Sequence, residues 1–145
     1  MSLIKGKELK KLYGDKFYKI IRNDMTHNKY VYKLGENVDT IEFNPTRECS
    51  EGGLYFTIKE NVRLYITYRI KVGIINIDDD ENVWCEEDKF KVHKLCLIEI
   101  ISLEEHINTL KEDEIIKYVQ IDKELLKFVK NQTEIICLEA VRFIK

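Results

Sequence analysis

Two side chains in the amino-terminal half of the chain have the chemistry of a nucleophile and its base. Cys49 and His27 both lie in segments rich in turn-forming residues, where functional side chains are often presented. A thiol beside an imidazole is the pairing that activates a cysteine nucleophile. The residues around them match no nucleophile motif, and the sequence contains no phosphate-binding loop or metalloprotease motif. Cys49 and His27 are therefore candidates without a defined reaction.

Two segments that could bind a metal lack the arrangement of ligands that a metal site requires. A calcium-binding loop that began at Asp78 would need glycine where Val83 stands and a bidentate glutamate where Lys89 stands. A zinc site would need clustered ligands, but His93 and Cys96 would face opposite sides of one regular strand. We therefore expect no metal site, and we expect the acidic segment 78–82 to be a solvated turn.

The segment 43–57 contains Pro45, the only proline, and Gly52-Gly53, the only pair of adjacent glycines. In a glycine-rich phosphate-binding loop, a helix begins directly after the glycines. Here the glycines are followed by an apolar segment that contains Tyr55 and is typical of a strand. We therefore expect Pro45 to fix a turn, and Gly52 and Gly53 to serve the backbone through positive φ or close approach.

Length and composition are those of an ordinary globular protein. The chain has 145 residues, 44% hydrophobic and 34% charged, which suffices for one domain whose core needs no disulfide or metal. The first five residues are too short an apolar run for a signal peptide, and no stretch reaches the roughly 18–20 apolar residues of a membrane span. Four cysteines without tight pairing fit a reducing compartment. We expect no membrane partner and no cofactor.

Charge is unevenly distributed. Residues 1–33 hold nine Lys/Arg against three Asp/Glu, whereas the remainder holds fifteen against twenty-three. Nucleic-acid binding through this basic third is an alternative function, with contacts from Lys10, Lys11, Lys16 and Lys19. Because no arginine cluster or interleaved aromatic pattern accompanies these lysines, we expect them to be solvated surface residues.

The predicted elements give an α+β fold: a mainly antiparallel, twisted sheet with one or two packed helices and a helical carboxy-terminal third. A short helix should end at Gly14, and the alternation of residues 59–70 fits either a helix or a strand. Ser102 and Glu105 have the spacing of a capping box, after which helical periodicity continues. Residues 1–101 should form the β module and residues 102–145 a helical segment packed on it. The expected strands are 17–22 and 29–34, forming a hairpin, then 40–43, 53–57, 73–77, 83–85 and 90–101.

A series of short motifs resembles a module of mimivirus-type giant viruses that often precedes ankyrin or other short helical repeats. In chain order the motifs are Phe17-Tyr18-Lys19-Ile20, Thr26-His27-Asn28, Asp39-Thr40-Ile41, Phe43-Asn44-Pro45, Glu48-Cys49 and Gly52-Gly53-Leu54-Tyr55-Phe56-Thr57. Residues 128–141 resemble a fragment of the short helical repeat. The resemblance implies a viral protein of the host cytoplasm and favours a helix after Thr57. It brings no defined activity.

The function expected from this resemblance, and from the lack of a catalytic motif, is a non-catalytic protein-interaction module with an unknown protein partner. The alternative is an enzyme that uses NAD, because 52–57 resembles the glycine-leading, tyrosine-bearing strand of ADP-ribosyltransferases. In that alternative Tyr55 lies on the strand, and His27 and Glu99 correspond to the upstream histidine and the later glutamate.

Overall fold

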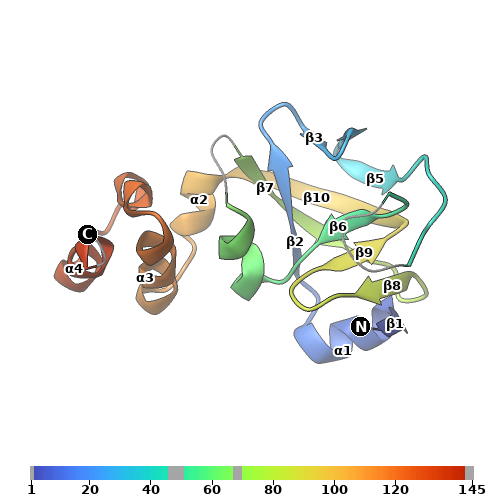
Figure 1. The fold of residues 1–145 in the computed structure, drawn as a ribbon, viewed down its shortest axis with the longest axis horizontal. Coiled ribbons are helices and arrows are strands. Elements are labelled where there is room, and N and C mark those ends of the chain that lie inside the picture. The colour runs from blue at the N-terminus through green and yellow to red at the C-terminus, as the bar shows by residue number, and fades with distance from the viewer. Residues whose placement is uncertain (1, 46–50, 67–69, 143–145) are drawn as a thin grey trace. The chain divides into compact units, whose positions relative to one another are not determined.

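The structure is a computed structural model that describes residues 2–45, 51–66 and 70–142 (Figure 1). The chain forms two compact units, Met1–Ile100 and Ile101–Lys145, which divide one residue before the predicted boundary. Antiparallel strand pairs and several helices confirm the α+β class.

The strands of the described ranges form two four-stranded sheets and a small hairpin. One sheet has the order β1-β8-β9-β6, and the other has the order β2-β7-β10-β5. An antiparallel bridge joins the sheets, because Tyr18 and Thr57 exchange backbone hydrogen bonds of 2.9 and 2.8 Å. The strands are β1 Ser2–Lys5, β2 Phe17–Arg22, β3 Thr26–His27, β4 Tyr30–Val31, β5 Gly35–Val38, β6 Leu54–Phe56, β7 Ile70–Asn76, β8 Asn82–Cys85, β9 Phe90–Val92 and β10 Lys94–Ser102.

Residues from both sheets and from α1 (Gly6–Tyr13) share one apolar core. Leu9 of α1 contributes to it, and Gly14 ends this helix with a φ of 85°, as predicted. Of the segment 59–70, which fitted either a helix or a strand, residues 59–65 form a 3₁₀ helix, η1 (Lys59–Tyr65). Ile70 begins β7, and residues 67–69 lie outside the described ranges. The remaining core side chains are Phe17, Ile21, Tyr32, Leu54, Phe56, Ile75, Ile77, Val83, Phe90, Val92, Leu95 and Leu97.

The predicted hairpin of 17–22 with 29–34 is wrong. β2 pairs with β7, and the hairpin is the much shorter β3–β4. The strand predicted at 29–34 ends at Val31 because the backbone of Lys33 is hydrogen-bonded by a side chain instead of a neighbouring strand. The fully buried side chain of Asn37 accepts from Lys33 N (3.0 Å) and donates to Lys33 O (2.7 Å).

Residues 35–38, where no strand was predicted, form β5, which pairs with residues 94–97 of β10. Residues 40–43 form no strand. The carboxylate of Asp39 accepts from Ile41 N (3.2 Å) and Gly53 N (2.7 Å). These backbone N–H groups therefore bond to a side chain rather than to the backbone of a neighbouring strand. The predicted strand 90–101 is two strands, β9 and β10, interrupted at His93.

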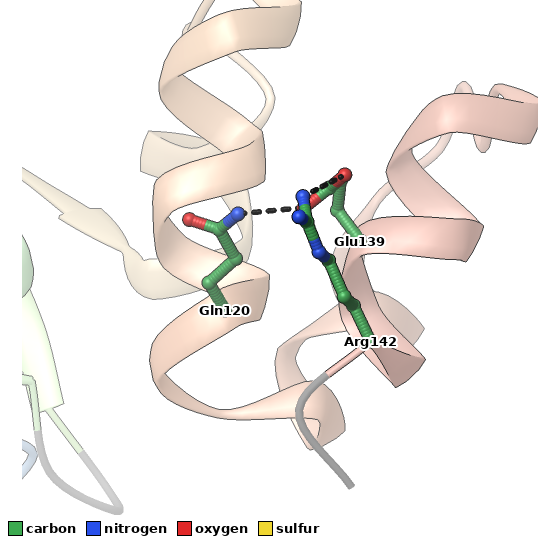
Figure 2. A network of polar contacts seen from close by, with 3 residues as sticks. All are labelled: Gln120, Glu139 and Arg142. Atoms are coloured by element: carbon green, nitrogen blue, oxygen red, sulfur yellow. Dashed lines mark hydrogen bonds and ion pairs between the residues drawn. The ribbon is translucent and has the colours of Figure 1, made fainter.

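Unit Ile101–Lys145 contains short helices, none of which in the described range is long and apolar enough to cross a membrane. Ser102 accepts from Glu105 N (3.0 Å) and so caps the first of them, as predicted. Figure 2 shows Gln120 donating to Glu139 (2.8 Å), which also pairs with Arg142 (3.3 Å), so that α3 and α4 are linked. The helices are α2 Leu103–Ile107, α3 Glu112–Ile121, the 3₁₀ helix η2 Lys123–Phe128 and α4 Glu134–Val141.

Gly52 and Gly53 have positive φ values of 89° and 154° and no room for a side chain. A Cβ at Gly52 would overlap the carbonyl oxygen of Glu42, and a Cβ at Gly53 would overlap the side chain of Lys91. Gly52 O also accepts from Asn44 N (2.7 Å). Gly52 therefore allows close backbone approach, and Gly53 leaves room for the side chain of Lys91, at the start of β6.

Replacing Gly52 by alanine should destabilise the unit more than the same change at Gly35. The two glycines have nearly equal φ values, 89° and 91°, but nothing lies within 4 Å of a Cβ at Gly35. The backbone penalty is therefore shared, and the overlap at Gly52 should add about 1–3 kcal/mol. Urea unfolding followed by the fluorescence of Trp84, the single tryptophan, measures the difference. Equal losses for the two variants would contradict this account.

Candidate functional site

The site is built around Lys19, which occupies a core position of β2. Alternation along the strand places Phe17, Lys19 and Ile21 on the same face. Phe17 and Ile21 are fully buried, and Lys19 is only 2% exposed. The prediction that Lys19 is a solvated surface residue is therefore wrong, because strand parity carries its side chain inward.

The Lys19 ammonium is held by an imidazole rather than by a carboxylate. Its Nζ lies 2.7 Å from Nδ1 of His27 and 5.1 Å from the ring centre of Tyr32. An ammonium group can only donate, so His27 Nδ1 accepts, and the proton of the neutral imidazole is on Nε2. Among the described residues, no carboxylate forms an ion pair with Lys19.

The β3–β4 hairpin brings His27 to this position. Asn28 and Lys29 join its strands with φ values of 49° and 70°, the double positive φ of a type I′ turn. Asp24 holds the entry, since its carboxylate accepts from Thr26 N (3.0 Å) and Thr26 Oγ1 (2.6 Å). This tight hairpin fixes the ring of His27 against β2.

Burial shifts the protonation of both partners toward the neutral form. Desolvation, helped by the charge of Lys89, lowers the pKa of Lys19 to about 7. Desolvation also lowers the pKa of His27 to about 4, together with the charges of Lys19, Arg22 and Lys89. At neutral pH the imidazole is therefore neutral, and the amine exists in both forms.

Lys19 and His27 line a cavity of about 350 Å³ between β2, β6 and η1. The basic side chains at its wall are Lys19, Arg22, His27 and Lys89, and no acidic residue of the described ranges lines it. The Nζ of Lys89 lies 4.5 Å from the ring centre of Tyr55. The other lining residues are Tyr18, Ile20, Asn28, Tyr55, Phe56, Thr57, Tyr65 and Ile70.

A second, smaller cavity of about 110 Å³ shares His27, Asn28 and Tyr55 with the first. Its wall includes Gly52 and Gly53. The glycine segment and the Lys19 site are therefore neighbours around Tyr55, whose side chain is 6% exposed.

The structure brings together some of the predicted site residues. His27 and Tyr55 line the same cavity. Glu99 is exposed on β10 and lines neither cavity, and Pro45 is also exposed. Cys49 lies outside the described residues. In the portion of the chain that the structure covers, no three His, Cys, Asp or Glu side chains cluster as metal ligands would.

Sequence reasoning missed Lys19 as a site residue. The available signal was its place between Phe17 and Ile21 in a six-residue strand. Comparisons with family models, curated proteins and solved structures found no match to this chain. The site is therefore interpreted from its own geometry.

Replacing Lys19 by methionine should change how stability depends on pH. Between pH 7 and about 10.4 the unfolded chain holds a proton that folded Lys19 has lost, so the free energy of unfolding rises with pH. This one site contributes a slope approaching about 1.4 kcal/mol per pH unit. Below pH 7 the variant should be the more stable protein, because no charge is buried.

Urea unfolding of the wild type and Lys19→Met at pH 7.0 and 8.5, followed by Trp84 fluorescence, gives the two slopes. Lys16→Met is the matched control, because Lys16 is exposed, and it should keep the wild-type slope. If the slopes of wild type and Lys19→Met agree, Lys19 is not a buried amine with a lowered pKa.

Proposed function

We propose that this protein is a non-catalytic binding module whose first unit recognises an anionic group in the Lys19 cavity. The observation that carries the proposal is the cavity wall, which contains the amine of Lys19, the cations Arg22 and Lys89 and the neutral ring of His27, with no acidic residue among the described ones. A charge pattern of one sign focuses the field on the cavity and favours ligands of the opposite sign.

The hydrogen bonds of Lys19 support this function. An ammonium group has three donors, and within the described ranges Lys19 Nζ uses one of them, toward His27. A carboxylate or phosphate oxygen would provide the missing acceptors. The apolar and aromatic lining, which includes Ile20, Phe56 and Ile70, would cover the body of the ligand.

In the setting that the resemblance to the giant-virus module implies, this module would act in the cytoplasm of an infected host cell. Its anionic ligand would be a small molecule or a group presented by a protein partner, and the helical segment 102–145 would belong to the same interaction module. The chemistry that the cavity recognises is the same for both sources.

One observation favours the NAD-dependent alternative: His27 and Tyr55 line one cavity, and NAD carries an anionic pyrophosphate. Glu99 lies outside that cavity, so the later glutamate of this alternative has no place in it. Nucleic-acid binding has less support, because Lys19 is buried and Lys10 pairs with Asp79 at 2.8 Å.

Benzoate should bind and benzamide should not, since the two differ mainly in charge. NMR titration of the labelled protein should show benzoate shifts at Lys19, His27 and Tyr55. Binding to the ammonium form requires proton uptake above pH 7, so the affinity should fall by up to about tenfold per pH unit there.

Lys89→Met should weaken benzoate binding about tenfold or more, and Lys16→Met should leave it unchanged. Equal binding of benzoate and benzamide, or shifts that lie elsewhere, would rule out the anion site. NAD in the same titration tests the alternative: consumption of NAD would overturn the non-catalytic assignment.

A further inference from the structure

We propose that the Nζ of Lys19 is a nucleophilic amine that condenses with the carbonyl group of a ligand in the cavity to form an imine. This rests on the proposed function, because the cavity must first admit an anionic ligand. The ligand class is an aldehyde or ketone that also carries a carboxylate or phosphate.

The surroundings of Lys19 favour an amine rather than a permanent ammonium. A lysine that serves only as a structural charge is usually paired with a carboxylate, which stabilises the protonated form. Here the partners in the described residues are the neutral ring of His27 at 2.7 Å and the face of Tyr32 at 5.1 Å. Burial in an apolar pocket beside another cation is the usual way that a lysine becomes a nucleophile at neutral pH.

The hydrogen bond to His27 places a proton acceptor on the reacting nitrogen. When Nζ attacks the carbonyl carbon, the new C–N bond forms and the carbonyl π electrons move to oxygen. His27 Nδ1 accepts the proton that the nitrogen loses and returns it to that oxygen, which gives a carbinolamine. Loss of the hydroxyl group as water, with one further proton taken from Nζ, completes the imine. Amine and carbonyl thus become imine and water, with no oxidant or reductant.

The positions of the other cations define the rest of the ligand. Arg22 and Lys89 also line the cavity, and they would hold the anionic group while the carbonyl faces Lys19. The ring of Tyr55, which lies under Lys89, would contact the body of the ligand. An aromatic or short aliphatic carbonyl acid fits a cavity of about 350 Å³.

The titratable groups that interact with Lys19 are His27, Tyr32 and Lys89. The other titratable groups that line the cavity are Tyr18, Arg22, Tyr55 and Tyr65. Burial lowers the pKa of His27 to about 4 and raises the pKa of Tyr32, so both are neutral from pH 6 to 9. The reactivity of Lys19 should therefore rise through about pH 7 and then level off. An amine of a solvated lysine, with a pKa of about 10.4, would still be gaining reactivity at pH 9.

Reductive trapping tests the inference. The full chain is incubated with 4-carboxybenzaldehyde and cyanoborohydride, which reduces the imine to a stable amine, and the labelled sites are mapped by peptide mass spectrometry. Lys19 should be labelled at least about tenfold faster than any other lysine at pH 7.5, in line with a far larger neutral fraction. Benzaldehyde, which lacks the anionic group, should label Lys19 at least about fivefold more slowly.

Lys19→Met should lose the fast label, and Lys16→Met should retain it. If Lys19→Met does not fold, unfolding the wild type in urea replaces it, and the preference for Lys19 should disappear there. Labelling spread over exposed lysines with none on Lys19, while benzoate still binds, would overturn the amine chemistry and leave the anion site standing. Failure of benzoate itself to bind would remove both.

Discussion

The burial of an amine inside a β core is the constraint on which the rest of this site depends. Lys19 stands between Phe17 and Ile21 on the inner face of β2, where a methylene stem packs well and a charged end does not. The surrounding structure resolves this conflict without a carboxylate among the described residues, through the ring of His27 and the face of Tyr32. The β3–β4 hairpin supplies the His27 ring to this site.

A second buried lysine organises the neighbouring part of the same unit. Lys91, fully buried on β9, donates to the carbonyl oxygens of Asn44 (2.8 Å) and Glu51 (3.4 Å) and so links the backbone at these two residues. Its stem lies over Gly53, which is why a side chain has no room there. Lys91 also lies 5.5 Å from the ring centre of Tyr55. Tyr55 therefore connects the glycine segment to the Lys19 cavity.

Local signals made part of this fold predictable from sequence. Gly14 ends α1 and Ser102 caps α2 because each depends on residues one turn away. The short hairpin and β5 were not predicted because they depend on interactions that a short stretch of sequence does not reveal. These are the hydrogen bonds of the buried Asn37 side chain and the pairing of β5 with β10.

The candidate site was only partly predictable for the same reason. His27 and Tyr55 were identified by residue type, and they do line one cavity. Lys19 was not, because Tyr18 and Ile20 give the other face of β2 an equally apolar pattern, so that alternation did not fix which face is inside.

The chemistry of this site depends most on the protonation of Lys19. A titration of the lysine side-chain Cε and Nζ resonances by NMR, assigned with Lys19→Met, measures it directly. We predict that the Lys19 resonance titrates with a pKa of about 7 and that the His27 ring stays neutral between pH 6 and 8. A Lys19 resonance that titrates near 10.4, like a lysine in water, would contradict the buried amine and the chemistry built on it.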